Sequence, residues 1–130
     1  LAYIAVADAA GAMAFAETVF GAETVGVLRH EDGAVWNGEM KLGDNRFMFA
    51  EARGFGPHPA FLYVYVNDCD AVIDKAVSAG AELVQPPDEQ FYGDRNGGVR
   101  DPFGNLWWIA TQTESVAPDE MQRRAAERKG

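Results

Sequence analysis

The stretch YIAVADAAGAMAFAETVFGAETV (residues 3–25) can be laid on LYVYVNDCDAVIDKAVSAGAELV (residues 62–84) without a gap. The triplet Gly-Ala-Glu at positions 21–23 falls on a second Gly-Ala-Glu at positions 80–82. Self-similarity at a fixed offset indicates that one structural unit is used more than once. The sequence therefore predicts two modules of the same architecture in a chain of 130 residues, a length typical of a single domain.

Both copies begin as a short apolar strand that leads into a helix. An aspartate stands near the start of each predicted helix (Asp8 and Asp70), and a glycine ends it (Gly21 and Gly80). Such residues are favoured at the two ends of a helix. Apolar residues recur at helical spacing between them, so each helix has one face to bury. These residues are Ala12, Ala16, Val19 and Phe20 in the first helix and Val72, Ala76 and Val77 in the second.

Further strands follow each helix. Residues 34–42 and 45–51, joined at Gly43-Asp44, have the pattern of a hairpin. Residues 97–101 and 105–111 repeat that pattern in the second copy. The predicted unit is βαβββ, used twice, which makes an α+β fold. We place module one at 1–52, a linker at 53–59, module two at 60–113, and a C-terminal helix at 114–130.

Charge and composition limit the partners. Against 20 Asp and Glu there are 11 Lys and Arg, so the formal net charge is −9, which disfavours nucleic acids and anionic membranes and favours a cationic ligand. The single cysteine, Cys69, cannot form a disulfide within the chain. No apolar run approaches the ~20 residues that span a bilayer. We therefore expect a cytoplasmic protein that binds a small molecule, with neither a nucleic acid nor a membrane as partner.

Strand alternation predicts a helix-facing side and an open side for each sheet. On the helix-facing side we expect Ile4, Val6, Met48, Ala50, Leu62, Val64, Val66, Trp107 and Ile109. On the open side we expect Leu1, Tyr3, Ala5, Phe47, Phe49, Glu51, Phe61, Tyr63, Tyr65 and Trp108. The open side is thus predicted to be aromatic in both modules.

The paired βαβββ units, the FGAE and AGAE helix ends, and above all DRNGGVRDPFGNLWWIA (residues 94–110) resemble the vicinal oxygen chelate superfamily. That superfamily contains glyoxalase I, bleomycin-resistance proteins and extradiol dioxygenases. The resemblance covers residues 1–113. It implies two modules that each curl into a half-barrel, a ligand site in the open cup, and an intimate or swapped homodimer.

The resemblance also implies where a metal would be held. Metal-binding members take one ligand, commonly His or Glu, from the first and last strand of each module. Carried over by position, these ligands fall at Leu1, Phe61, Trp108, and either Phe47 or Phe49. None of these side chains carries a donor atom for a divalent metal. We therefore expect neither a metal nor a cofactor, and the two histidines, His30 and His58, are interpreted as surface residues.

What remains is an aromatic cup. Rings can stack on a planar ligand and attract a cation, and Glu51 is the carboxylate expected to face the cup. We predict metal-independent binding of a small planar aromatic or cationic molecule, as in antibiotic sequestration. The residues predicted to bind it are Tyr3, Phe47, Phe49, Glu51, Phe61, Tyr63, Tyr65, Phe91, Tyr92 and Trp108.

Phe91 and Tyr92 belong to this set because they lie in a long connection, residues 85–98, that could form a lid over the cup. A second interpretation of this segment is equally compatible with the sequence. A charge pair, either Asp94 with Arg95 or Arg100 with Asp101, would then order the turn.

Two other functions remain open. One is a glyoxalase-like lyase or dioxygenase, with a metal held in a shifted register by Glu51, Glu39 or His58, or with Glu51 as an acid–base group. The other is an interaction module whose aromatic faces are buried in a homodimer and bind no small molecule.

Overall fold

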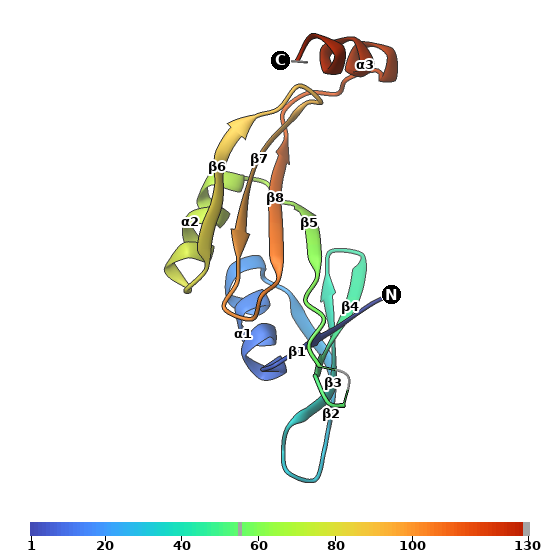
Figure 1. The fold of residues 1–130 in the computed structure, drawn as a ribbon, viewed down its shortest axis with the longest axis vertical. Coiled ribbons are helices and arrows are strands. Elements are labelled where there is room, and N and C mark those ends of the chain that lie inside the picture. Colours follow the sequence, from blue (N-terminus) through green and yellow to red (C-terminus); the bar gives the residue numbers. More distant parts are fainter. Residues whose placement is uncertain (55, 129–130) are drawn as a thin grey trace.

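The computed structural model describes residues 1–54 and 56–128. Residue 55 of the predicted linker and residues 129–130 of the predicted C-terminal helix lie outside the described residues. The chain has an α+β fold in which the order βαβββ occurs twice and a helix follows (Figure 1). The elements are β1 (Ala2–Val6), α1 (Ala9–Phe20), β2 (Glu23–Arg29), β3 (Val35–Leu42), β4 (Asn45–Glu51), β5 (Phe61–Tyr65), α2 (Cys69–Ser78), β6 (Glu82–Glu89), β7 (Asp94–Arg100), β8 (Leu106–Gln112) and α3 (Pro118–Glu127).

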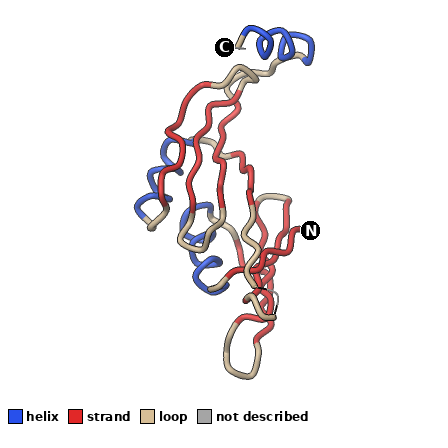
Figure 2. The backbone as a smooth tube through the Cα atoms, viewed as in Figure 1, coloured by secondary structure: helices blue, strands red, loops and turns tan. Residues whose placement is uncertain are grey.

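The two modules form two sheets with the same plan. The first sheet has the order β1-β4-β3-β2 and the second sheet β5-β8-β7-β6. The first strand of each module runs parallel to the last, and the other pairs are antiparallel. Helices α1 and α2 contact each other and lie along one side of the strands (Figures 1 and 2). The opposite side of each sheet, its open face, carries no helix of the described residues (Figures 1 and 2).

The helix ends are capped by the chemistry that the sequence predicts, with two changes of residue in α2, where the C-cap is Ala79 and the predicted Gly80 follows it. Asp8 accepts a hydrogen bond from the backbone N–H of Gly11, and Gly21 ends α1 in the left-handed conformation at φ 70°. In α2 the capping side chain is that of Asp68, which accepts from the N–H of Ala71. Asp70 was predicted for this position, but it lies in the first turn, where a carboxylate is also favourable.

The predicted orientation of the β4 side chains was wrong. We expected Phe47 and Phe49 on the open side, but the parallel register of β1 and β4 places Phe49 beside Ile4, and Met48 beside Tyr3. Ile4 packs under α1, so Phe49 does too, and its side chain is 0% exposed. Phe47 lies on the same face and is also part of the core. These rings fill the space under the helix and cannot line the open side.

Trp107 joins the cores of the two modules. The side chain is buried, as predicted, together with Ile109. Its indole ring stacks on Phe20 with ring centroids 4.5 Å apart and lies 6.3 Å from the ring of Phe15. Because both phenylalanines belong to α1 and Trp107 belongs to β8, this contact connects module one to module two.

The segment DPFGN forms a hydrogen-bonded turn before β8, in which the side chains of Asp101 and Asn105 are buried. The carboxylate of Asp101 accepts hydrogen bonds from the backbone N–H groups of Phe103 and Asn105, both at 2.9 Å. It also accepts from the Asn105 amide at 3.0 Å and from the Trp107 indole at 2.8 Å. Asn105 Oδ1 in turn accepts from the backbone N–H of Ala60 at 2.9 Å. One buried carboxylate therefore fixes the turn, the tryptophan and, through Asn105, the entry to β5.

The segment predicted as a long loop at 85–98 is mostly strand. β6 extends to Glu89 and β7 begins at Asp94, so only a short turn connects them. Pro86 and Pro87 obscured the strand in the sequence, because proline cannot donate a hydrogen bond to a ladder. It is tolerated here because β6 is an edge strand and its register with β7 shifts between Gln85 and Asp88.

Candidate functional site

The open face of the second sheet carries a set of exposed aromatic rings. Tyr63 of β5 lies beside Trp108 of β8, and Trp108 lies beside Gly98 of β7. The side chains of Phe61, Tyr63 and Tyr65 are 63%, 44% and 61% exposed. Large apolar side chains gathered on one exposed face are typical of a binding or interaction site.

The ring of Trp108 lies across Gly98. A Cβ atom built on Gly98 would overlap the six-membered ring of Trp108, so the indole occupies the space that a side chain at residue 98 would take. On β5, Phe61 stacks with Trp108 at a centroid distance of 5.7 Å and an interplanar angle of 24°. Gly98 thus allows the indole to lie against the sheet and form a platform with Phe61.

A buried carboxylate lies beside the tyrosines of this face. Asp94 of β7 is 4% exposed. Its Oδ2 accepts the hydroxyl hydrogen of Tyr63 at 2.6 Å and that of Tyr65 at 2.9 Å. Hydrogen bonds to a carboxylate are stronger than those between neutral groups. The two tyrosine hydroxyls are therefore held toward Asp94.

Asn96, two residues further along β7, extends this cluster. Its Nδ2 donates to the hydroxyl oxygen of Tyr63 at 3.0 Å and to that of Tyr92 at 2.8 Å. The side chain is 1% exposed, and its Oδ1 is buried without a hydrogen-bond partner among the described residues. A buried polar atom without a partner is uncommon in a folded protein and calls for an explanation. We use the name polar cluster for Tyr63, Tyr65, Tyr92, Asp94 and Asn96.

The phenols of Tyr63 and Tyr65 have pKa values raised above that of a free tyrosine. Burial, followed by the hydrogen bond to Asp94, raises the pKa of Tyr63. For Tyr65 the hydrogen bond to Asp94 is the main cause that raises its pKa. Both effects disfavour a second negative charge next to the carboxylate. Tyr63 and Tyr65 therefore act as hydrogen-bond donors to Asp94.

The structure brings together only part of the predicted set. Phe61, Tyr63, Tyr65 and Trp108 share the open face of the second sheet, and Tyr92 reaches it through Asn96. Phe91, predicted as a lid residue, makes its described ring contacts with Tyr92 and Arg128. Its ring packs edge-on against Tyr92 and beneath the guanidinium of Arg128, whose Cζ is 5.2 Å from the ring centroid.

The carboxylate of Glu51, predicted to supply the charge of the cup, is engaged at the start of α1. The register of β1 and β4 places it beside buried Val6. Its Oε1 accepts a hydrogen bond from the backbone N–H of Ala9 at 2.9 Å, at the start of α1. A carboxylate at this position stabilises the positive end of the helix dipole. The structure therefore assigns Glu51 a contact at the helix terminus.

Tyr3 lies in a separate hollow on the open face of the first sheet. This hollow, about 160 Å³ in volume, is lined by Tyr3, Ala5, His30, Trp36, Ala50, Glu51 and Arg53. Within it the rings of His30 and Trp36 stack at a centroid distance of 4.9 Å and 9° between planes. Within one copy of the chain, these residues and the polar cluster belong to different sheets.

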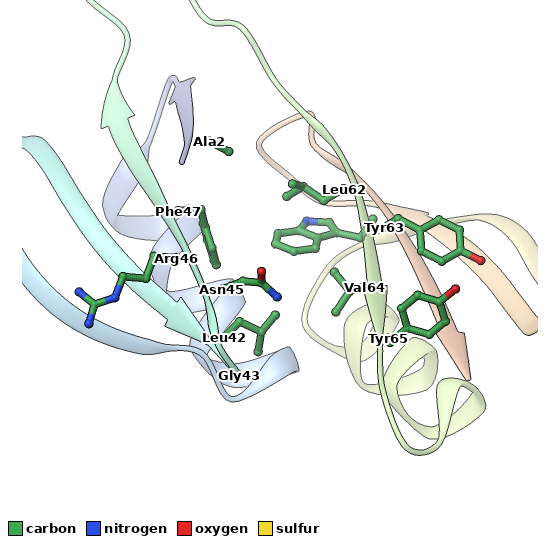
Figure 3. A pocket seen from close by; sticks show the side chains of 11 residues that line it. Ala2, Leu42, Gly43, Asn45, Arg46, Phe47, Leu62, Tyr63, Val64 and Tyr65 are labelled. Atoms are coloured by element: carbon green, nitrogen blue, oxygen red, sulfur yellow. The ribbon is translucent and has the colours of Figure 1, made fainter. Parts of the chain in front are cut away.

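A larger hollow, about 470 Å³, lies between the two modules. Figure 3 shows Phe47, Leu62 and Val64 facing this space, whereas the rings of Tyr63 and Tyr65 point away from it. The side chains on the two sides of β5 therefore lie in different environments. One is an apolar seam between the modules, and the other is the aromatic open face.

The charge pairs proposed to order the turn are not those observed. Arg95 pairs with Asp70 through two hydrogen bonds of 2.8 and 2.9 Å, and these lower the pKa of Asp70 to about 2. Arg100 pairs with Glu82 at 3.1 Å. Neighbouring residues on a strand point to opposite sides, so Arg95 is directed to α2 while Asp94 faces the open side.

Asp94 and Asn96 are not among the site residues predicted from the sequence. A signal was present, because Asp94, Asn96 and Gly98 stand at alternate positions and so share one face of a strand. The strand that contains Trp108 follows after a hairpin turn. The signal was hidden by residues typical of a turn, Gly-Asp-Arg-Asn-Gly-Gly at 93–98. Placing the strand at Asp94 would have brought these residues to the face of Trp108.

Metal-ligating side chains do not gather anywhere in residues 1–54 and 56–128: no three or more His, Cys, Asp or Glu are placed to hold an ion. The positions that the resemblance assigned to ligands are Leu1, Phe61 and Trp108, together with the buried Phe47 or Phe49. Over the same part of the chain, no helix is both long and apolar enough to cross a bilayer.

Comparison with known proteins gives a family match and a shared fold. The model of the Glyoxalase/Bleomycin resistance protein/Dioxygenase superfamily matches residues 1–109. An uncharacterized protein of Mycobacterium tuberculosis is 29% identical over 132 residues, covering 92% of this chain and 78% of that protein. An uncharacterized protein of Arabidopsis thaliana is 30% identical over 125 residues, covering 84% of this chain and 74% of that protein. TioX from Micromonospora sp. ML1 has the same fold, with a TM-score of 0.71 at 24% identity, covering 85% of this chain and 94% of that chain.

Proposed function

The chain belongs to the Glyoxalase/Bleomycin resistance protein/Dioxygenase superfamily, and on this premise we propose that it binds a small planar aromatic molecule without a metal. The ligand lies on the open face of the second sheet. The observation that carries this proposal is the platform formed by half-buried Trp108, which lies over Gly98, and exposed Phe61, on a face that no helix of the described residues covers. Binding without chemistry, as in antibiotic sequestration, is the class of function that it supports.

Stacking gives this face an affinity for flat molecules. Aromatic pairs contribute about 0.5–1.5 kcal/mol each beyond the burial of their area. Trp108 and Phe61 offer two adjacent rings, and the tyrosines lie next to them on β5. The net charge of −9 adds a long-range attraction for cations. A planar cation therefore fits the face better than a flat anion of equal size.

A second copy of the chain completes the site. We propose a homodimer in which the open face of the first sheet of one copy covers the open face of the second sheet of the other. Apolar side chains are exposed on both faces: Tyr3 and Trp36 on the first, Phe61 and Tyr65 on the second. Faces of this kind are usually buried by a partner, and such pairing would turn two open sheets into a cup.

Titration with a planar cationic probe tests the binding proposal. Wild-type protein is expected to bind 9-aminoacridine, with heat measured by calorimetry and with quenching of tryptophan fluorescence. Trp108→Ala should weaken binding by at least about tenfold, because the main stacking surface is lost. Val77→Ala, which removes an exposed apolar side chain on α2, is the matched control and should bind like wild type. Equal affinity of the Trp108 variant would contradict the assignment.

Two further measurements test the remaining parts of the proposal. Sedimentation should show a dimer, and Trp36→Asp should shift it toward the monomer, whereas Val77→Asp on the helix side should not. A wild-type monomer at all concentrations would contradict the dimer.

Elemental analysis of the purified protein tests metal independence, and one equivalent of zinc, nickel, manganese or iron per chain would contradict it.

A further inference from the structure

The polar cluster has hydrogen-bonding capacity that the protein itself does not use. Asn96 Oδ1 is buried and accepts no hydrogen bond from the described residues. Both tyrosine hydroxyls donate to Asp94 Oδ2, and within the described part of the chain no hydrogen bond reaches Asp94 Oδ1. Two oxygens on one strand face are thus left as acceptors. A ligand bound beside them meets groups that require hydrogen-bond donors.

The direction of the hydrogens in the cluster is fixed by its connections. Asn96 Nδ2 donates to the hydroxyl oxygen of Tyr63, and the hydroxyl of Tyr63 then donates to Asp94. Because an ionised carboxylate can only accept, this chain runs one way. The Tyr65 hydroxyl is likewise committed to Asp94. Among the described residues the Tyr92 hydroxyl, which accepts from Asn96, is the donor of the cluster that remains uncommitted, and the free oxygens of Asp94 and Asn96 are acceptors.

The charge of Asp94 is not balanced by a cationic side chain. No ion pair joins Asp94 to a lysine, arginine or histidine in the described ranges. The neighbouring arginine, Arg95, is paired with Asp70 on the other side of the sheet. Buried charges in proteins are normally paired or coordinated. Only hydroxyl groups compensate Asp94, so a cation brought to this face would find an unpaired carboxylate.

We infer that Asp94 and Asn96 form the polar end of the ligand site and select a planar aromatic cation that carries N–H donors, such as an amino-substituted nitrogen heterocycle. This inference rests on the proposed function, because it uses the stacking platform of Trp108 and Phe61 to hold the ring. The platform accepts any flat molecule. Asp94 and Asn96 discriminate by charge and by hydrogen bonding. Tyr63 and Tyr65 are positioning residues that hold the carboxylate through their hydroxyls.

Three acridines of nearly equal shape separate these contributions. 9-Aminoacridine is a cation with N–H donors, 10-methylacridinium is a cation without them, and acridine is neutral in mildly alkaline buffer. Calorimetric titration of the wild-type protein should give the tightest binding for 9-aminoacridine, by at least about tenfold over acridine, since a hydrogen bond to a charged group is involved. 10-Methylacridinium should bind more weakly than 9-aminoacridine.

Asp94→Asn provides the second arm, since it keeps the shape and an acceptor oxygen for the tyrosine hydroxyls. It should weaken binding of 9-aminoacridine by about tenfold and leave acridine unchanged, because only the charged acceptor is removed. Asp74→Asn, on the solvent side of α2, removes the same charge and should have no effect. Near-ultraviolet circular dichroism verifies that the Asp94 variant keeps its tertiary structure.

The outcomes distinguish this inference from the proposed function. If all three acridines bind with equal affinity, the stacking site stands and the inference is wrong. Equal affinity of the two cations would show that the N–H donors do not contribute to binding, and this result would also overturn the inference. If none of the three binds, the proposed function itself fails. The net charge of −9 attracts both cations alike, so the comparison of 9-aminoacridine with 10-methylacridinium in the wild-type protein tests the role of the N–H donors even if Asp94→Asn does not fold.

Discussion

The indole Nε1–H of Trp107 donates a hydrogen bond of 2.8 Å to Oδ2 of Asp101, and both side chains are buried. The same carboxylate accepts three more hydrogen bonds from the turn that precedes β8. Trp107 also stacks on Phe20 of α1. A single acidic side chain thus supports the turn of module two and the ring that packs against module one.

Asp101→Ala is expected to lower the free energy of unfolding by about 3 kcal/mol or more, because several buried donors lose their acceptor. Urea denaturation followed by tryptophan fluorescence measures this loss. Asp101→Asn, which keeps one acceptor oxygen, should lose less. Asp44→Ala in the exposed β3–β4 turn is the control and should unfold like wild type. A loss below about 1 kcal/mol for Asp101→Ala, less than the usual cost of unsatisfied buried donors, would contradict this account.

Gly98→Ala is expected to weaken binding of 9-aminoacridine, because the added methyl group occupies the place of the Trp108 ring and displaces it. A change in tryptophan fluorescence should accompany the loss of affinity. Gly26→Ala in β2 is the matched substitution, since no atom lies within 4 Å of a Cβ there. Unchanged affinity and emission of the Gly98 variant would show that the indole does not depend on this glycine.

Phe49→Ala and Phe61→Ala each remove a phenyl ring, the first from the helix-covered face of the first sheet and the second from the open face of the second sheet. Phe49 is buried under α1, so its loss should lower the free energy of unfolding by about 3–5 kcal/mol. Phe61 is exposed, and its loss should change stability by about 0.5 kcal/mol or less while weakening ligand binding. Chemical denaturation and calorimetric titration of both variants check these expectations. Equal stability losses would contradict the observed face assignment of β4.

Stability at alkaline pH should reflect Tyr65. Its pKa is raised in the folded protein, whereas a tyrosine in the unfolded chain ionises near pH 10. Above about pH 10 the unfolded state therefore releases this proton first, and folding stability falls as the pH rises. Above about pH 10 the free energy of unfolding of the wild-type protein should fall more steeply with pH than that of Tyr65→Phe. Below about pH 10 the two proteins should show the same dependence on pH. Urea midpoints at a series of pH values measure the difference, and parallel curves throughout would contradict it.

The sequence was sufficient to predict the arrangement of the fold. Duplicated Gly-Ala-Glu helix ends and the repeated strand pattern predicted two βαβββ units, and the structure confirms them. The face of β4 could not be predicted in the same way. The strand Phe47-Met48-Phe49-Ala50 is apolar on both sides, and a period of two then allows either orientation. Only its pairing with β1, which puts Phe49 beside Ile4, decides between them.

The candidate site was predicted only in its apolar half. Phe61, Tyr63, Tyr65 and Trp108 alternate on strands with aliphatic residues on the other side, which is a clear signal. The alternation of Asp94 with Asn96 and Gly98 is a weaker signal, because the sequence alone does not distinguish a carboxylate buried among hydroxyls from one exposed in a turn. Its environment depends on hydrogen bonds from Tyr63 and Tyr65, about thirty residues away in the chain.

The buried side chains of Asp101 and Trp107 belong to the core, whereas Phe61 and Trp108 lie on the open face of the same sheet. Most of the interactions that hold the fold are therefore separate from those offered to a ligand. Substitutions at Phe61 or Trp108 can alter recognition at little cost to folding, as long as the hydrogen bonds beneath them are kept. Such a division makes this framework evolvable, and it offers a starting point for the engineering of receptors for other flat molecules.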